Sequence, residues 1–300
     1  MPSLQDKIVV ITGSTRGFGR AVAEASLKAG ATVVISGRKQ ADVDRVVADL
    51  QALGPVSGQA CDVSDLDQAL GLARHALTTW GRFDIWINNA GVSTAAGRLI
   101  DFPPEDALTT FRVNDLGAFH GTKVAMAHFL PRDEGVLVNI YGAGSFLKPA
   151  TPMGLYGMTK AWLTSFTRTL AKEHKNSGVQ IIGFSPGMML TEMLTRPAVL
   201  GEEGEAMLEK FPFVLRVLGQ PPEKPAHKLT ELLADNRKPF VEYRTIKPWT
   251  FPLGMLNVLW ENITGRGQTP EFELQIRPPD RISLEDIHAA VSATGDEKSV

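Results

Sequence analysis

The sequence predicts an α/β fold in which helices cover both faces of a doubly wound parallel sheet of about seven strands. Three observations lead to this prediction. Short runs of β-branched and other apolar residues recur along the chain, and segments with helical periodicity alternate with them. The runs lack a polar face, which is typical of strands buried on both sides. Glycine-rich or polar motifs follow many of the runs directly, and strict alternation favours a parallel sheet with right-handed crossovers.

The alternation can be followed from the N-terminus to about residue 245. The expected strands occupy residues 7–12, 31–36, 57–61, 82–88, 135–141, 179–184 and 240–243. The expected helices occupy residues 20–30, 40–53, 65–80, 104–130 and 222–234, and a further helix carries Tyr156 and ends near residue 176. Asn114 lies in the middle of the 104–130 helix, where an asparagine is unfavourable and usually needs a specific reason.

The bulk composition excludes several classes of protein. The 300 residues include 31 Lys and Arg against 33 Asp and Glu, and this near-neutral balance argues against a nucleic-acid partner. The single cysteine, Cys61, excludes an intrachain disulfide and a cysteine metal cluster, and we expect no metal site. The N-terminus lacks the apolar core of a signal peptide. No apolar run approaches the ~18 residues of a membrane span, so we expect a cytoplasmic protein without an integral membrane segment.

A glycine-rich loop joins the first strand to the first helix. Its residues are Gly13, Ser14, Thr15, Arg16, Gly17, Phe18 and Gly19. Glycines permit close approach of the backbone to a ligand, and the helix that follows offers free N–H groups and a positive dipole to a pyrophosphate. In this context the loop predicts dinucleotide binding, although many ordinary turns also contain a glycine triplet.

The end of the second strand predicts which dinucleotide is preferred. An acidic residue at this place would hold the ribose 2′-hydroxyl of NAD. The chain instead has Ser36, Arg38 and Lys39 here, and Arg16 lies in the first loop. Positive charge and a hydroxyl suit a 2′-phosphate, so we expect NADP(H) in preference to NAD(H). The alternative is that these charges belong to a solvated loop.

Tyr156 and Lys160 are four residues apart, so on a helix both side chains lie on one face. A phenol normally titrates near pH ~10, and a cation beside it favours the phenolate and lowers its pKa. A tyrosine altered in this way can exchange a proton with a substrate oxygen near neutral pH. A lone pair of this kind is more often a surface feature of an amphipathic helix, so the interpretation depends on the rest of the chain.

Five motifs occur in a characteristic order and spacing: TGSTRGFG from residue 12, NNAG from residue 88, Asn114, YGMTK from residue 156 and SPGMMLT from residue 185. Together they resemble the short-chain dehydrogenase/reductase family over about residues 5–195. The resemblance implies a Rossmann fold and NAD(P)-dependent interconversion of a carbonyl and an alcohol. It also implies a homodimer or homotetramer.

The resemblance assigns roles to individual residues. Tyr156 would be the acid/base, Lys160 would lower its pKa and bind the nicotinamide ribose, and Asn114 would hold a water of the proton relay. The remaining residues expected beside the cofactor are Asp62, Val63, Asn89, Ala90, Gly91, Pro186, Gly187, Met189 and Thr191. For the two asparagines of the NNAG turn, a structural role in bonding the backbone is at least as well supported by the sequence.

One position departs from the family pattern. The family usually has a serine thirteen residues before the tyrosine, where it hydrogen-bonds the substrate oxygen, but this chain has Ala143. The nearest serine is Ser145, and a backbone shift in the Gly-Ala-Gly turn before it could bring it into place. We therefore expect Ser145 to be the catalytic serine, with the absence of any such serine as the alternative.

The loop with Ser145 and the two motifs around it look like the chlorophyll b reductase-like branch of the family. Apolar residues near the site suggest a wide apolar substrate pocket, although such residues are more often simple core. We expect residues 1–245 to form the catalytic domain, with a substrate lid over about residues 192–220, and residues 246–300 to form a C-terminal extension and tail. The apolar segment 247–260 could pack on the domain, line the pocket, join subunits or lie on a membrane surface.

These expectations combine into a function. The chain is predicted to be an NADP(H)-dependent carbonyl reductase acting on a fairly large apolar ketone or aldehyde, with Tyr156 as proton donor. The alternative is a non-catalytic NADP(H)-binding sensor or scaffold protein, which the missing serine at position 143 would favour. No additional acid/base pair supports dehydration or epimerisation.

Overall fold

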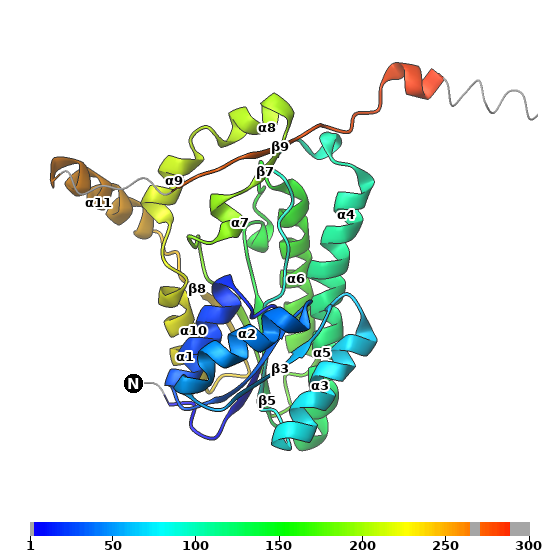
Figure 1. Ribbon diagram of the computed structural model, residues 1–300, viewed down its shortest axis with the longest axis vertical. Helices are drawn as coiled ribbons and strands as arrows, with labels where there is room; N and C mark the ends of the chain where they lie inside the picture. The colour runs from blue at the N-terminus through cyan, green and yellow to red at the C-terminus, as the bar shows by residue number, and fades with distance from the viewer. Residues whose placement is uncertain (1–2, 265–270, 289–300) are drawn as a thin grey trace, which may run out of the picture.

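The computed structural model describes residues 3–264 and 271–288 (Figure 1). Its centre is a parallel sheet of seven strands in the order β3-β2-β1-β4-β5-β6-β8. The strands are β1 (Ile8–Ile11), β2 (Thr32–Gly37), β3 (Val56–Ala60), β4 (Ile85–Asn88), β5 (Gly135–Ile140), β6 (Val179–Ser185) and β8 (Phe240–Arg244). The order reverses direction between β1 and β4, which defines a doubly wound sheet and confirms the predicted fold class.

Helices cover both faces of the sheet. One face packs against α1 (Gly17–Lys28), α2 (Gln40–Leu50) and α10 (Glu223–Asp235), and the other against α3 (Leu66–Trp80), α5 (Gly117–Phe129) and α6 (Gly154–Glu173). Strand residues alternate between the two cores: Val9 and Ile11 of β1 join the first, whereas Ile8 and Val10 join the second. Because both faces are covered, the central strands are apolar throughout, as the sequence indicated.

The helix predicted over residues 104–130 has an irregular middle. It consists of α4 (Pro104–Phe111), a π-helical turn over Arg112–Leu116, and α5. Asn114 lies in this turn. A π turn widens a helix locally and redirects its side chains, and such turns often occur at functional sites. The asparagine that is unfavourable in a regular helix is therefore located where the helix is not regular.

The segment after β6 lies above the carboxyl ends of the strands. It contains α7 (Glu192–Thr195), β7 (Ala198–Leu200), α8 (Gly201–Leu208) and α9 (Phe211–Leu218). The C-terminal arm returns to this region, where β9 (Gln275–Arg277) pairs in parallel with β7 (Figure 1). The sequence predicted the arm but not this pairing. Residues 284–288 are helical, and the end of the predicted tail lies outside the described residues.

Helix α11 (Thr250–Thr264) projects from the body beside α9 (Figure 1). It contains most of the apolar segment 247–260. Val258 is its one buried residue, and Arg216 of α9 pairs with Glu261 at 3.3 Å. Most of its large apolar side chains are exposed. Within the described residues, no helix is long and apolar enough to cross a membrane.

Candidate active site at the carboxyl edge of the sheet

The predicted motifs converge beyond the carboxyl ends of the strands. Gly13 follows β1 with φ of +63°, and a Cβ built on it would lie 2.8 Å from Cα of Ala90, which follows β4. A Cβ on Gly17 would lie 3.7 Å from Cγ2 of Thr191, which follows β6. Glycine is required at position 13 because the backbones of the two loops are in contact there. The loops after β1, β4 and β6 therefore form one continuous surface.

Hydrogen bonds inside the protein shape the glycine-rich loop. The Ser14 hydroxyl donates to the Ile11 carbonyl at 2.8 Å and accepts from the Ser36 N–H at 2.9 Å. Ser36 is fully buried, and its own hydroxyl donates to the Ile11 carbonyl at 3.3 Å. We expected Ser36 to face a 2′-phosphate. This expectation is wrong, because the buried hydroxyl bonds to the backbone at the start of the loop. Phe18 is likewise a core residue, stacked on Phe184.

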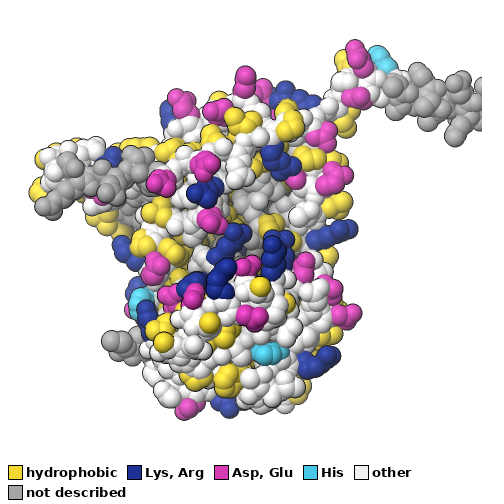
Figure 2. Space-filling model, viewed as in Figure 1, with side chains coloured by type: hydrophobic (Ala, Val, Ile, Leu, Met, Phe, Trp, Pro, Cys, Tyr) yellow, Lys and Arg dark blue, Asp and Glu magenta, His cyan; other side chains and the backbone are white. Residues whose placement is uncertain are grey.

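Exposed cations lie beside this loop. Arg38 and Lys39 follow β2 and are exposed, while Thr15 of the loop packs against Gly37. Arg16 forms an ion pair with Glu192 of α7 at 2.7 Å. Figure 2 shows Lys and Arg side chains gathered on the visible face between α2 and α7. This face therefore carries positive charge, although Arg16 already has a carboxylate partner.

Asn89 connects two of the loops. Its side-chain amide donates to the carbonyls of Thr12 and Gly13, both at 2.9 Å, and its backbone N–H donates to the Thr12 hydroxyl at 3.0 Å. The N–H of Ala90 donates to the same hydroxyl. The Asn89 side chain thus bonds backbone, which agrees with the structural alternative, and the loop it fixes remains at the proposed cofactor surface.

The turn after β3 approaches the site from the other side of the glycine-rich loop. Asp62 accepts hydrogen bonds from the N–H and hydroxyl of Ser64 at 3.0 and 2.7 Å. Val63 is buried, and its carbonyl lies 3.0 Å from Nδ1 of His120 on α5. These contacts hold the turn in a defined shape, as a surface for the adenine would require.

Tyr156 and Lys160 lie side by side at the start of α6. Nζ of Lys160 is 5.5 Å from the centre of the Tyr156 ring and donates to the Ile140 carbonyl at 3.0 Å. Lys160 is buried and Tyr156 is partly buried. The phenol oxygen packs against Gly142, where a Cβ would collide with it. The predicted i, i+4 pair therefore exists at the end of β5, in the cleft rather than on a solvated helix face.

Burial controls the titration of this pair. Burial raises the pKa of Tyr156 to about 12 and lowers the pKa of Lys160 to about 8. We expected the lysine to lower the pKa of the phenol, and this is wrong because burial raises it. The ammonium donates to the Ile140 carbonyl, and loss of hydration dominates at the phenol. At neutral pH the phenol therefore holds its proton, as a proton donor must.

Asn114 lies beside the same pair. Its amide oxygen accepts from the Val92 N–H at 2.8 Å, and its amide nitrogen donates to the Val92 carbonyl and the Thr159 hydroxyl, both at 3.0 Å. A Cβ on Gly91 would lie 3.3 Å from Oδ1 of Asn114 and 3.8 Å from Nζ of Lys160. Asn114 and Lys160 therefore both adjoin Gly91. The π turn directs the asparagine inward to join the loop after β4 to α6.

Ser145 does not join this group. It is buried, its hydroxyl donates to the Lys160 carbonyl at 3.2 Å, and it accepts from the Gly142 N–H at 3.2 Å. Among the described residues, no hydrogen bond connects the hydroxyls of Ser145 and Tyr156. The turn expected to move Ser145 toward the substrate instead holds its hydroxyl against the backbone. The catalytic role of Ser145 therefore has no geometric support here.

The sequence did not indicate two charged residues of the site. Glu192 is the partner of Arg16, and Asp115 follows Asn114 in the π turn. Asp115 is 3 % exposed, and its buried Oδ1 has no hydrogen-bond partner within residues 3–264 and 271–288. Burial raises its pKa to about 7, against the opposing effect of Lys160. A signal was present in the sequence, because four residues without polar side chains, Leu116 to Phe119, follow this aspartate directly.

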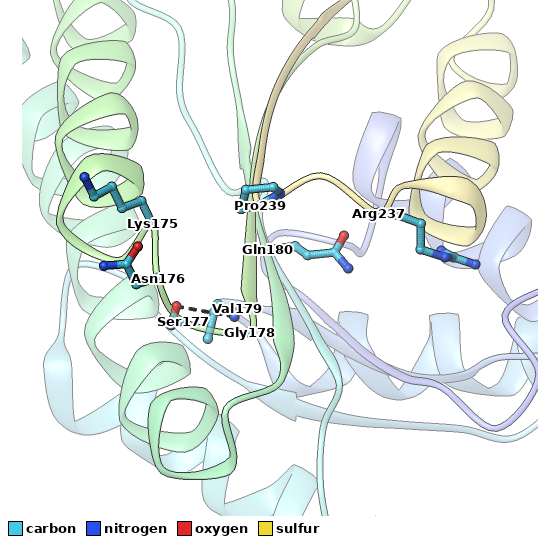
Figure 3. A pocket seen from close by; sticks show the side chains of 8 residues that line it. All are labelled: Lys175, Asn176, Ser177, Gly178, Val179, Gln180, Arg237 and Pro239. Carbon is cyan, nitrogen blue, oxygen red and sulfur yellow. Dashed lines mark hydrogen bonds between the residues drawn. The ribbon is translucent and has the colours of Figure 1, made fainter.

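A shallow cavity of about 320 Å³ lies at the opposite edge of the sheet, near the starts of β6 and β8 (Figure 3). Lys175 and Arg237 line it, but Figure 3 shows their side chains directed away from each other. Ligands of open parallel sheets bind beyond the carboxyl ends of the strands, so this cavity is not the functional cleft. No group of three His, Cys, Asp or Glu side chains in the described part of the chain could hold a metal ion.

Comparison with known proteins identifies the family. The family model of the short chain dehydrogenases matches residues 7–198. The chain therefore belongs to the short-chain dehydrogenase family, as the motifs indicated. An uncharacterized oxidoreductase of Bacillus subtilis is 34% identical over 189 residues, covering 63% of this chain and 71% of that protein.

A probable chloroplastic chlorophyll(ide) b reductase of Arabidopsis thaliana is 33% identical over 205 residues. The match covers 62% of this chain but only 41% of the plant protein, so the two differ greatly in length. Among solved structures, a short chain dehydrogenase/reductase from Burkholderia phymatum in complex with NAD superposes with a TM-score of 0.70 and 26% identity. The superposition covers 95% of this chain and 100% of the Burkholderia chain. The 3-ketoacyl-(acyl-carrier-protein) reductase from Brucella melitensis, complexed with NADH, superposes with a TM-score of 0.69 and 25% identity. This match covers 81% of this chain and 98% of the reductase chain.

Proposed function

We propose that the protein is an NADP(H)-dependent oxidoreductase that reduces a ketone or aldehyde of a fairly large apolar substrate, with Tyr156 as the proton donor. The observation that carries the proposal is the Tyr156–Lys160 pair in the cleft, in which Nζ lies 5.5 Å from the centre of the phenol ring. Burial raises the pKa of this phenol, which favours its protonated form at neutral pH. When bound, the nicotinamide supplies a hydride to the carbonyl carbon. Tyr156 gives its proton to the carbonyl oxygen, which yields the alcohol.

The residues around α1 fit a dinucleotide. The N-cap residue of α1, Arg16, makes no side-chain cap, and the first turn carries no acidic side chain. The free N–H groups and dipole of this helix start therefore suit a pyrophosphate. Solved relatives contain NADH or NAD. The preference for NADP(H) rests on this chain's own exposed cations, Arg38 and Lys39, and on the absence of an acid after β2.

The remaining residues position the reacting groups. Lys160 places a cation beside the phenol and stabilises negative charge that develops on Tyr156 as the proton leaves. Asn114 fixes the loop after β4 against α6 and so orients the lysine. Several apolar side chains are exposed in the loop between β5 and α6 and in the segment after β6. They include Leu147, Leu190 and Met193, and they support a large apolar substrate.

Substitution of Tyr156 tests the catalytic part of the proposal. We expect Tyr156→Phe to lower the rate of carbonyl reduction by roughly 10²–10⁴-fold while NADPH binding is retained, because the proton donor alone is removed. Initial rates across a panel of apolar aldehydes and ketones, together with NADPH titrations, would measure both quantities. Full activity of the variant would contradict the assignment of Tyr156.

Nucleotide titrations test the cofactor preference. We expect wild type to bind NADPH more tightly than NADH, and Arg38→Ala to remove most of this difference. Arg45→Ala is the matched control, because Arg45 is an exposed arginine on α2 that pairs with Asp42. Equal binding of the two nucleotides by wild type would refute the preference for NADP(H) and leave the fold unaffected.

The geometry of Ser145 favours one second candidate, a non-catalytic NADP(H)-binding sensor or scaffold. The serine hydroxyl is bonded to backbone, and position 143 offers no replacement, so one donor to a substrate oxygen is missing. Loss of such a donor typically costs ~10²–10³ in rate. Tight NADPH binding without turnover across a broad panel of carbonyls and alcohols would favour this candidate over the reductase.

A further inference from the structure

The segment 192–220 leaves the sheet after β6 and returns to the same point. The N–H of Leu190 donates to the Gln220 carbonyl at 3.0 Å, and the side-chain amide of Gln220 donates to the Pro186 carbonyl at 2.9 Å. Both ends of the segment are therefore fixed beside the loop after β6. The far part of the segment, which contains β7 and α8, depends on contacts with other elements for its position.

This far part reaches the loop after β4. The Ala96 N–H donates to the Ala198 carbonyl of β7 at 2.7 Å, and the Leu200 N–H donates to the Ala96 carbonyl at 2.9 Å. Leu200 also belongs to an apolar cluster against which Leu155, the neighbour of Tyr156, packs. Because β5 lies between β4 and β6 in the sheet, the segment crosses the end of β5 and the cleft that holds Tyr156.

The C-terminal arm (residues 271–283) is bonded to one edge of this segment. β9 pairs in parallel with β7, and the Gln275 N–H donates to the Pro197 carbonyl at 3.1 Å. The Glu273 N–H donates in the same way to the Thr195 carbonyl at 2.9 Å. The arm therefore runs alongside the segment that crosses the cleft (Figure 1).

Arg281 of the arm joins α8 to the body of the protein. Its guanidinium donates to both carboxylate oxygens of Asp101, at 2.6 and 2.9 Å, and also to Oε2 of Glu203 on α8, at 2.6 Å. Asp101 lies before α4 and is fully buried, and a bidentate pair of this kind fixes the guanidinium in one orientation. Arg98, from the same loop, reaches Glu203 at 3.2 Å. The far part of the segment is therefore tied to the body through Glu203.

We propose that Arg281 is a positioning residue that holds segment 192–220 closed, as a lid over a substrate bound beside Tyr156. The role in reduction rests on the proposed function, whereas closure of the segment by the arm does not. Closure excludes water from the reacting groups and keeps a bound substrate in place. The contact with Asp101 fixes the arginine, and the contact with Glu203 fixes the lid. When the contact with Glu203 breaks, β7 and α8 move away from the loop after β4 and the substrate can enter.

Hydrogen–deuterium exchange tests the closure without any need for turnover. Glu203→Ala removes the contact between the lid and Arg281 but leaves the buried pair with Asp101 in place. We expect amide exchange in β7 and α8 to become about two- to fivefold faster, the range that a partly exposed ion pair supplies. Exchange in β1 and β4 should not change. Exchange in β7 and α8 at the wild-type rate would overturn the proposal.

Arg281→Ala and Arg82→Ala form a matched pair for the same measurement. Arg82 also pairs with a mostly buried carboxylate, that of Asp84 at 3.1 Å, but it lies at the amino end of β4 and far from the lid. Arg281→Ala should speed exchange in β7 and α8 at least as much as Glu203→Ala does, and Arg82→Ala should leave it unchanged. Equal acceleration by Arg281→Ala and Arg82→Ala would show a general loss of stability and refute a specific closure by Arg281.

Steady-state kinetics test the consequence for the reaction. We expect Glu203→Ala to raise KM for a large apolar carbonyl by about two- to fivefold at unchanged kcat, because the lid contributes to substrate binding and not to proton transfer. Arg281→Lys should give a KM between those of wild type and Arg281→Ala. A lower kcat at unchanged KM would indicate a merely structural role and contradict the proposal. If wild type shows no turnover, the proposed function fails, and the exchange rates alone decide whether the arm closes the lid.

Discussion

Buried carboxylates have different surroundings in two regions of the molecule: the cleft at the carboxyl edge of the sheet, and the junction where the C-terminal arm packs against the body. Asp101 and Asp115 are both almost inaccessible. At the junction, Arg281 forms two hydrogen bonds with Asp101, at 2.6 and 2.9 Å, and these bonds lower the pKa of that carboxyl. In the cleft, Asp115 has no hydrogen bond to Oδ1 within residues 3–264 and 271–288, and burial raises its pKa to about 7.

The difference extends to the neighbouring side chains. Ion pairs hold the arm to the body, and they are Arg277–Asp106, Arg281–Asp101, Arg281–Glu203 and Arg196–Glu273. The polar side chains of the cleft, such as Asn114 and Ser145, bond mainly to backbone and leave the charges of Asp115 and Lys160 only partly compensated. Charge at the junction is therefore paired between side chains, whereas Asp115 and Lys160 of the cleft are buried without an ion-pair partner in the described part of the chain. Substitutions should consequently affect chiefly stability in the first region and activity in the second.

The largest effect is expected from Gly142→Ala in the cleft. A methyl group at position 142 would collide with the phenol oxygen of Tyr156, so the ring must move away from Lys160. A displacement of about 1 Å at a reacting group can cost ~10²-fold in rate, and we expect a loss of at least this size. Steady-state kinetics with an accepted carbonyl substrate would measure it, and NADPH titration should show that the cofactor surface is intact.

Gly71→Ala is the matched control for this substitution. Gly71 lies in α3, and a Cβ there meets no atom within 4 Å. This variant should retain full activity and gain up to ~1 kcal/mol of stability, because alanine is the better helix former. Equal activity of Gly142→Ala and Gly71→Ala would show that the position of the phenol does not matter, which contradicts the assignment of Tyr156.

The next effect concerns the junction. We expect Arg281→Ala to lower the unfolding temperature more than Arg277→Ala, because it leaves the fully buried Asp101 unpaired, whereas Asp106 is partly solvated. Asp101→Asn combined with Arg281→Ala should recover part of the loss, since the unpaired charge is then removed. Thermal unfolding followed by circular dichroism would compare the variants. An Arg281→Ala protein as stable as wild type would show that the arm does not stabilise the body.

The two regions also differ in how far the sequence predicts them. The central strands are mainly apolar on both faces, so the positions of the strands follow from a local pattern. The i, i+4 spacing brings Tyr156 and Lys160 together without knowledge of tertiary contacts. The junction depends on β7 and β9, which have three residues each, and on ion pairs between distant segments. Short strands and long-range pairs leave almost no local signal.

Within the cleft, the failures of prediction concern the direction of side chains. The sequence placed Ser36 at the end of the second strand and Ser145 in the loop after the fifth, but both hydroxyls bond to backbone carbonyls inside the protein. Small hydroxyl side chains can satisfy either a ligand or a nearby peptide group, and the backbone geometry decides between them. The sequence singled out Asn114 as unfavourable in a helix, but it did not predict the π turn that buries Asp115.

The free energy of unfolding should also depend on pH, and the buried carboxylates of the two regions should change it in opposite directions. The pKa of Asp115 is raised by folding, so between pH ~4 and ~7 the native state keeps a proton that the unfolded state releases. Its contribution therefore makes wild type less stable as pH rises, by up to ~1.4 kcal/mol per unit in this window. The pKa of Asp101 is lowered, so its contribution is present above pH ~4 and is lost at more acid pH.

Urea unfolding of wild type, Asp115→Asn and Asp101→Asn from pH 3 to pH 7 would separate these contributions. Relative to wild type, Asp115→Asn should gain stability steadily from pH ~4 to pH ~7, and below pH ~4 its difference from wild type should no longer change with pH. Asp101→Asn should differ from wild type in stability above pH ~4, and this difference should shrink only near pH ~3. Parallel curves for wild type and Asp115→Asn would contradict a raised pKa for the carboxyl in the cleft.

The smallest effect is expected for Arg16→Ala, which lies where the two regions meet. Arg16 of the glycine-rich loop pairs with Glu192 of α7 at 2.7 Å, but both side chains are largely exposed. Exposed ion pairs contribute at most ~1 kcal/mol, so the unfolding temperature should hardly change. If Arg16 leaves Glu192 to bind a 2′-phosphate, however, Arg16→Ala should weaken NADPH binding and spare NADH binding, whereas Glu192→Gln should strengthen NADPH binding at low salt. If Arg16→Ala weakens the binding of NADPH and NADH equally, the arginine would instead serve to maintain the conformation of the loop.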